Sequence, residues 1–359
     1  MSDDFVTRLQ LQLREAAERE SRRGGVARAA AVARWRIVSR PVLVGGTLAC
    51  ALAVVVAVTL SAVRHASPPV EQTLPTGHRL TVVADRALVK QGGAMATGFG
   101  AVWANDVGTG ELLRIDPRSR RVLARVAVGG EAFPVAGAGA VWATANGRLL
   151  RIDPATDRVT ARIGLGLGAR AFAAPAVVRG VMWVFTPLEL MRIDVRHNAI
   201  DRRIGLDRQG YQASGYAFDQ RLLYVLRADR VLLAFDAATG ARISSTRLPV
   251  DGSSIGAADG AVLLTTGSEV VAVNVRSGQI LWRADASGER VNGGIVADGS
   301  VWIHVTPRNG IRDRVLRLDA HDGRVTGSLT LPDFGVAGAT PVGDEIWIVS
   351  LNGRLVIAR

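Results

Sequence analysis

Two side chains in this sequence are candidates for acid–base chemistry. His304 lies in a predicted strand, VWIHV, and Asp106 ends a related segment, VWAND. An imidazole and a carboxylate that lie close together can take up and release a proton, so Asp106 and His304 are a candidate general acid/base pair. The other histidines fall in linker or turn segments, where we expect them to be solvated: His65, His78, His197 and His321.

Six Asx side chains resemble a catalytic series because they recur at the end of the same kind of segment, such as LLRID. They are Asp116, Asp153, Asp194, Asp236, Asn274 and Asp319. An Asx side chain can accept a hydrogen bond from the backbone two residues on and so close a turn. Pro117 and Pro154 follow two of them with a backbone angle suited to that turn. We therefore predict that the six are structural.

A period of about 40 residues runs through most of the chain. The aromatic positions that align the units, or their equivalents, are 39, 41, 41, 39, 39 and 45 residues apart: Trp103, Trp142, Trp183, Tyr224, Leu263, Trp302 and Trp347. Each unit reads as short strands joined by turn residues. Seven such units predict an all-β fold, a seven-bladed β-propeller in which the Trp positions pack between blades.

The ends of the repeat region indicate how the ring closes. The seventh unit ends at Arg359 without a fourth strand, and residues 79–90 form a strand-like segment before the first unit. We expect residues 79–90 to complete the last blade of a propeller that spans residues 79–359. The small residues at 135–139 suit a crowded innermost strand near the axis.

Residues 41–63 are predicted to form a transmembrane helix. They carry no charge over 23 positions, which is enough to cross a bilayer. Arg residues cluster before the segment and Arg64 stands nearly alone after it, so we expect a single-pass protein of the cytoplasmic membrane with a cytoplasmic N-terminus and an extracytoplasmic propeller. A cleaved signal peptide is the alternative; with 40 residues before the span and no clear cleavage site after it, we favour an uncleaved anchor.

The flanking segments have different characters. Residues 1–40 are predicted to be a basic, helical, cytoplasmic segment, and residues 64–78 a linker rich in turn formers. Phe5, Leu9 and Leu13 form an apolar stripe at helical spacing. The stripe indicates either a cytoplasmic partner for residues 3–20, or a membrane-surface or poorly ordered tail.

Composition excludes some kinds of site. Cys50 is the sole cysteine, so an intramolecular disulfide and a Cys-based metal site are excluded. We expect no metal and no cofactor. The net charge of +12 is spread along the chain, and no Arg cluster is interleaved with aromatic residues, so we expect no nucleic-acid partner.

The segments VWA and LLRIDPATDRVTARI resemble the seven-bladed propellers of the YncE and streptogramin-lyase (virginiamycin B lyase) type, over roughly residues 79–359. The later segments FDAATGARI and VNVRSGQILWRA resemble pyrroloquinoline-quinone-type repeats, as in the assembly scaffold BamB. Resemblance to the lyases implies a Glu and His pair with a divalent metal at the axis. The position three after each aromatic holds no Glu, however: Asp106, Ala145, Thr186, Arg227, Thr266, Val305 and Ser350.

Ligand-binding residues are expected on the loops between blades, at the mouth of the propeller channel. The candidates are Glu131, Arg170, Tyr211, Asp251, Arg290, Asn292 and Asp333. These side chains would recognise a protein or a polar ligand. We expect a non-catalytic binding, scaffold or sensor propeller; a lyase or hydrolase at the channel mouth, and anti-sigma-like signalling through the N-terminal helix, are the alternatives.

Overall fold

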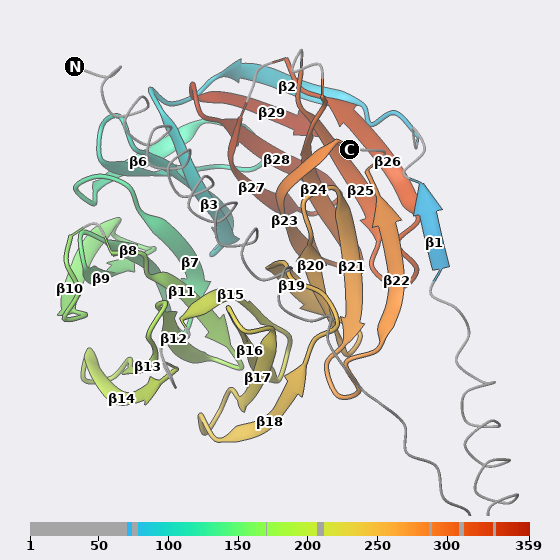
Figure 1. Ribbon diagram of the computed structural model, residues 1–359. Helices are drawn as coiled ribbons and strands as arrows, with labels where there is room; N and C mark the ends of the chain where they lie inside the picture. Colours follow the sequence, from blue (N-terminus) through green and yellow to red (C-terminus); the bar gives the residue numbers. More distant parts are fainter. Residues whose placement is uncertain are drawn as a thin grey trace, which may run out of the picture. The chain divides into compact units, whose positions relative to one another are not determined.

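In the described part of the chain, seven sheets follow one another and form a ring of blades (Figure 1). The computed structural model describes residues 70–73, 78–169, 171–206, 212–286, 289–308, 312–332 and 335–359. The predicted all-β class and the seven blades are therefore confirmed.

Some of the sequence predictions lie outside the described residues. They are the cytoplasmic segment 1–40, the transmembrane helix 41–63 and the candidate site residues Arg170, Tyr211 and Asp333. Within the described ranges, no helix combines the length and the apolar character needed to cross a membrane.

The first strand of each blade is innermost, and the others follow it outward. Blade 1 contains β3 (Gly92–Gly98), β4 (Ala101–Asp106), β5 (Glu111–Ile115) and β6 (Val122–Ala127). Blade 2 contains β7 (Phe133–Gly137), β8 (Ala140–Ala145), β9 (Arg148–Asp153) and β10 (Arg158–Gly164). Blade 3 contains β11 (Ala174–Val178), β12 (Val181–Phe185), β13 (Glu189–Asp194) and β14 (Ala199–Gly205). Blade 4 contains β15 (Ala213–Phe218), β16 (Leu222–Arg227), β17 (Val231–Asp236) and β18 (Arg242–Arg247).

The last three blades follow the same order. Blade 5 contains β19 (Ser253–Ala258), β20 (Ala261–Thr265), β21 (Glu269–Asn274) and β22 (Ile280–Asp285). Blade 6 contains β23 (Arg290–Ala297), β24 (Ser300–Thr306), β25 (Arg314–Asp319) and β26 (Val325–Thr330). Blade 7 contains β27 (Val336–Val342), β28 (Glu345–Ser350), β29 (Arg354–Ala358) and the outer strand β2 (Val82–Ala87).

Blade 7 joins sequence from both ends of the propeller. The strand β2 pairs antiparallel with β29, and the Thr81 N–H donates to the Arg359 carbonyl at 2.8 Å. Arg354 Nη2 lies 2.7 Å from Asp85 Oδ2 across the same pair of strands. This pairing closes the ring through backbone hydrogen bonds.

The chain ahead of β2 lies along the outer edges of blades 5 and 6. The strand β1 (Val70–Thr73) pairs in parallel with β22, so blade 5 has a fifth strand within the segment predicted as a linker. Next, the Ser328 N–H donates to the His78 carbonyl, and the Leu80 N–H donates to the Ser328 carbonyl, both at 2.8 Å. The described residues between 70 and 87 thus contact three successive blades.

The hydrophobic core is divided among the blade interfaces. The described core residues form seven clusters, each spanning two adjacent blades. Trp103, Trp142 and Trp183 lie in the clusters that join their own blade to the next, and each is 0% exposed. The prediction that the Trp positions pack between blades is confirmed.

Blade 5 also buries an indole at its interface with the next blade, but from a different position. Leu263 stands where other blades have an aromatic residue, and Trp282, on the outer strand β22, packs in the same cluster. Trp282 Nε1 donates to the Ala320 carbonyl of blade 6 at 3.1 Å. The interface therefore keeps a buried indole that comes from a different strand.

Arg side chains also join neighbouring blades. Arg114 Nη1 lies 3.2 Å from Asp157 Oδ2 of the next blade. The guanidinium carbon of Arg151 lies 5.3 Å from the Trp142 ring centroid, and Arg151 Nη1 donates to the Val195 carbonyl at 2.8 Å. Each guanidinium thus covers or adjoins a buried interface while it binds the outer turn of the adjacent blade.

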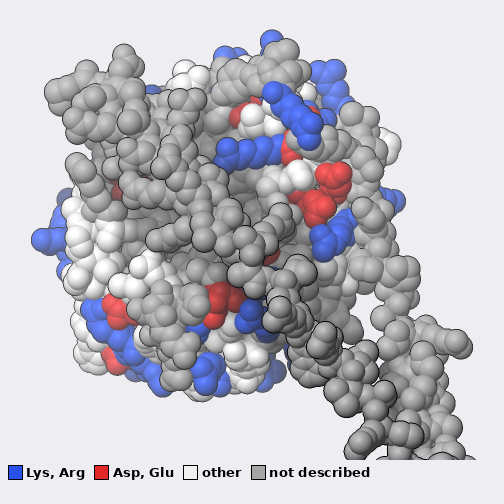
Figure 2. Space-filling model, in the orientation of Figure 1, with Lys and Arg blue, Asp and Glu red and all other residues white. Residues whose placement is uncertain are grey.

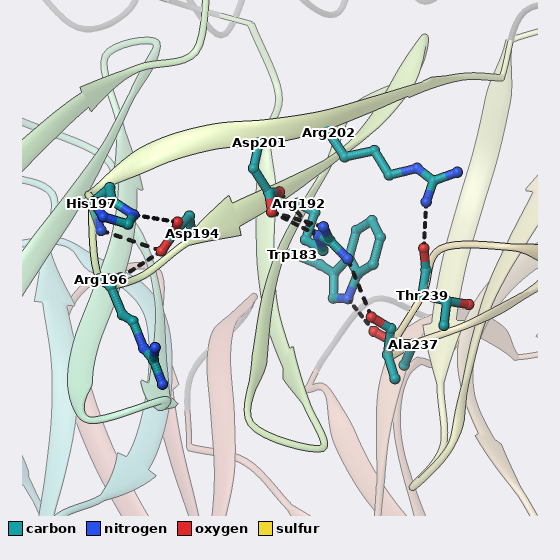
Figure 3. A network of polar contacts seen from close by, with 10 residues as sticks. Trp183, Arg192, Asp194, Arg196, His197, Asp201, Arg202, Ala237 and Thr239 are labelled. Atoms are coloured by element: carbon teal, nitrogen blue, oxygen red, sulfur yellow. Dashed lines mark hydrogen bonds and ion pairs between the residues drawn. The ribbon is translucent and has the colours of Figure 1, made fainter.

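Figure 3 shows such an interface between blades 3 and 4. Trp183 Nε1 donates to the Ala237 carbonyl at 2.9 Å, and Arg202 Nη1 donates to the Thr239 carbonyl at 2.6 Å (Figure 3). Both carbonyls belong to the tight turn after β17. The turns of one blade therefore accept hydrogen bonds from its neighbour.

The six Asx residues are confirmed as turn residues. In each, a side-chain oxygen accepts a hydrogen bond of 2.8 to 3.1 Å from the backbone N–H two residues on. His197 Nδ1 also lies 2.6 Å from Asp194 Oδ2 (Figure 3). This hydrogen bond lowers the pKa of Asp194 to about 2, and Asp194 raises the pKa of His197.

Candidate functional site

Two adjoining cavities lie beside the inner strands of the propeller. The first has a volume of about 550 Å³ and extends along β15, β19 and β23. The second, of about 400 Å³, lies between β23 and β27. Residues 292–295 of β23 line both cavities. The short side chains of the inner strands leave this space; they include Ala213, Gly215, Gly256 and Ala257.

Aromatic rings form one side of the first cavity. The Tyr216 ring stacks on Phe185 with centroids 4.7 Å apart, and Phe172 lies 6.2 Å from Tyr216. Phe133, which does not line the cavity, meets Phe172 edge-on, with ring centroids 5.5 Å apart. Phe172 is 45% exposed even though it lies in this cluster. The rings therefore run from the connections between blades into the cavity.

Burial of the cluster changes the acidity of its phenol. Loss of hydration disfavours the phenolate, and burial raises the pKa of Tyr216 to about 12. Tyr216 is therefore neutral at physiological pH and presents an uncharged ring to the cavity.

His304 lines the second cavity and is held by a buried carboxylate. His304 Nε2 lies 2.7 Å from Asp313 Oδ2, and the Gly335 N–H donates to the same oxygen at 2.7 Å. Burial raises the pKa of Asp313, but the hydrogen bonds from Gly335 and His304 outweigh it and hold the pKa below its ordinary value. Because the carboxylate is ionised, it accepts the Nε2 proton.

In other blades, the residue at the position equivalent to His304 has a structural role. Asn105 and Thr144 also come two residues after the interface Trp of their strands. Asn105 Oδ1 accepts the Ala132 N–H at 2.9 Å, and Thr144 Oγ1 donates to the Ala173 carbonyl at 2.5 Å. Each side chain binds the connection to the next blade. His304 does the same through the carboxylate described above, and it also faces a cavity.

Asp106 and His304 are not brought together. Asp106 accepts hydrogen bonds from the backbone N–H groups of Lys90, Gln91 and Gly108 at 3.1 to 3.2 Å. Burial raises the pKa of Asp106, but hydrogen bonds from Lys90, Gln91 and Thr109 more than offset it, so the pKa lies below its ordinary value. Asp106 therefore closes a turn on blade 1, whereas the partner of His304 is on its own blade 6.

The described candidates from the blade connections have different surroundings. Asn292 lines both cavities. Glu131 and Arg290 are exposed, and Asp251 is exposed with Oδ1 3.4 Å from Arg230 Nε. Among these four, Asn292 is therefore the residue that the fold places at the candidate site.

Sequence reasoning missed the aromatic side of the cavity. One signal was present: the dipeptide Ala-Phe recurs just before or at the start of an inner strand, with Phe133 and Phe172 in consecutive blades. Phe185 and Tyr216 occupy ordinary strand positions. Their contact depends on how blades 3 and 4 pack, which a repeat alignment does not include.

Comparisons with known proteins agree with this fold. A sequence model of the family described as outer membrane protein assembly factor BamB matches residues 227–357. The crystal structure of BamB from Moraxella catarrhalis has a TM-score of 0.53 and 16% sequence identity, and the match covers 78% of this chain and 99% of that chain. Among curated proteins, no sequence matches the chain. The described residues thus form a seven-bladed propeller with repeats like those of the pyrroloquinoline-quinone type.

Proposed function

We propose that this protein is a non-catalytic, membrane-anchored propeller that binds a protein partner outside the cytoplasm. The observation that carries the proposal is the aromatic cluster of Phe133, Phe172, Phe185 and Tyr216, which leads from the blade connections into a cavity. Aromatic side chains supply much of the binding energy in protein interfaces when they lie in or beside a pocket.

Similarity to a protein named as an assembly factor supports a scaffold role. That similarity concerns the fold, because the sequence identity is 16%. The segment LLRIDPATDRVTARI in blade 2 supports a more specific proposal, a YncE-like subtype within the propellers. Neither likeness names the partner, so the proposal rests on the surface chemistry of this chain.

Site-specific photo-crosslinking tests the partner site. A benzophenone amino acid at position 172 is expected to give one discrete protein adduct in membranes of the native host. Position 99 is a matched control, because Phe99 is 44% exposed in the β3–β4 turn on the opposite face. Equal adducts at 172 and 99, or none at 172, would contradict binding at this face.

The proposed membrane anchor is residues 41–63, with the propeller outside the cytoplasm. The uncharged run and the Arg-rich sequence before it support this topology. In a Cys50→Ala background, a cysteine at Ser67 should react with an impermeant maleimide in intact cells, whereas a cysteine at Ser39 should react only after lysis. The reverse pattern would contradict the proposed orientation.

A further inference from the structure

We infer that the two adjoining cavities form a site for an uncharged aromatic group presented by a polypeptide segment. This inference rests on the proposed function and specifies what the partner must carry. The site is defined by the residues that line both cavities, from the aromatic cluster on blades 3 and 4 to His304 on blade 6.

The lining is uncharged, in contrast to the outer surface. Among the described residues that line either cavity, none is Asp, Glu, Lys or Arg. Figure 2 shows Lys and Arg over much of the described exterior, with Asp and Glu among them. A charged ligand group would lose hydration in the cavities without meeting an opposite charge on their described walls, which is unfavourable. The site therefore discriminates against ions.

The carboxylate of Asp313, which lies next to the lining of the second cavity, strengthens the discrimination against anions. Asp313 is ionised and lies 2.7 Å from His304, which lines the second cavity. The negative charge of Asp313 disfavours an anionic ligand group near His304, and the imidazole adds a polar group to the lining. Ser253 and Asn292 add neutral hydrogen-bonding groups to the lining.

The shape of the first cavity suits an aromatic ring. Tyr216 is already stacked on Phe185 at an interplanar angle of 22°, and Phe172 is tilted over Tyr216 by 37°. Phe172 remains 45% exposed and Phe218 41% exposed, although both line the cavity. A ring inserted beside Phe172 and Tyr216 would add aromatic contacts of the same kind.

Two probes that share the aromatic ring but differ in the charge of the end group test the inference. N-acetyl-L-phenylalaninamide and N-acetyl-L-phenylalanine are titrated into the detergent-solubilised full chain at pH 7.5 by calorimetry. We expect the neutral amide to bind at least about tenfold more tightly than the carboxylate, since tenfold corresponds to only 1.4 kcal/mol of lost hydration and repulsion. Equal affinities, or a preference for the carboxylate, would overturn the inference.

Two variants locate the binding. Ser253→Lys places a cation on the lining and should reduce or reverse the preference for the amide. Phe172→Ala should weaken amide binding by about fivefold or more through lost aromatic contact, while Phe99→Ala, on the opposite face, should leave it unchanged. If Phe99→Ala weakens binding as much as Phe172→Ala, the probe binds elsewhere and the assignment is wrong.

A third probe tests whether the ring belongs to a polypeptide. The capped pentapeptide Ala-Ala-Phe-Ala-Ala should bind more tightly than the single amide because its backbone adds N–H donors for the lining. No gain would overturn the polypeptide part and point to a free small molecule. If no probe binds but position 172 still crosslinks a protein, the cavity inference fails while the proposed partner site stands.

Discussion

His304 Nε2 lies 2.7 Å from Asp313 Oδ2, and the same oxygen accepts the N–H of Gly335 at the start of blade 7. One carboxylate oxygen thus joins the histidine of blade 6 to the backbone of the next blade. The bond also fixes the orientation of the imidazole, which lines the second cavity. The arrangement serves the architecture and the candidate site together.

Asp313→Asn should weaken this link, because an amide oxygen accepts hydrogen bonds less strongly than a carboxylate, and should change the response to acid. The folded protein holds the pKa of Asp313 below its unfolded value, so the stabilisation is present above about pH 4 and is lost as pH falls through the folded-state pKa. We expect the variant to lose roughly 1–3 kcal/mol of unfolding free energy at pH 7. Urea unfolding at pH 7 and pH 3 should show the difference from wild type shrinking at the lower pH; a difference that does not depend on pH would contradict this account.

Tyr216→Phe should make the protein less sensitive to alkali. The pKa of Tyr216 is about 12 in the folded protein and about 10 when unfolded, so its neutral form stabilises the fold below pH 10, and this stabilisation is lost as pH rises toward 12. Between pH 8 and pH 11 the variant should lose about 1 kcal/mol less than wild type. Tyr224 is present in both proteins, so its contribution to the pH dependence cancels in the comparison. Equal losses would show that Tyr216 is not buried in solution.

Substitution of two glycines with the same φ should distinguish the cost of backbone strain from the cost of a steric clash. Gly323 and Gly180 both have φ of +76°, but a Cβ at Gly323 would lie 2.5 Å from Trp282, whereas a Cβ at Gly180 would meet nothing within 4 Å. Gly180→Ala should cost roughly 1–2 kcal/mol for the left-handed angle. Gly323→Ala should cost a further 1–3 kcal/mol, roughly, because the Trp282 interface is overpacked. Equal melting temperatures for the two variants would count against the packing of Trp282.

The Arg114 and Asp157 pair should couple blades 1 and 2 modestly. Their side chains are 23% and 24% exposed, so solvent screens part of the attraction. A double-mutant cycle with Arg114→Met and Asp157→Asn should give a coupling free energy of about 0.5–1 kcal/mol that falls at 1 M NaCl. The exposed pair Arg125 and Glu111 is a control within one blade and should couple less. A coupling that salt leaves unchanged would rule out the ion pair as its source.

The repeat could be read from sequence because each unit must bury the same surfaces. Trp103 and Trp142 belong to a series that recurs about every 40 residues, because every blade presents one face to the next. Asp116 and Asp153 recur because every outer turn needs an acceptor. These requirements are local or repeated, so a single chain displays them several times. Leu263 shows the limit: the missing indole comes from Trp282, on another strand of that blade, and only the packing reveals the replacement.

By itself, the sequence determined the number of blades, the interface aromatic residues and the structural role of the Asx turns, because all of these follow from a periodic pattern of burial. The tertiary structure decided which distant side chains meet: Phe185 with Tyr216 across two blades, and His304 with Asp313 rather than Asp106. Among the described residues, neither contact repeats around the ring. The physical reason is that a candidate site arises where the repeats differ, and such differences acquire meaning only when the blades are packed side by side.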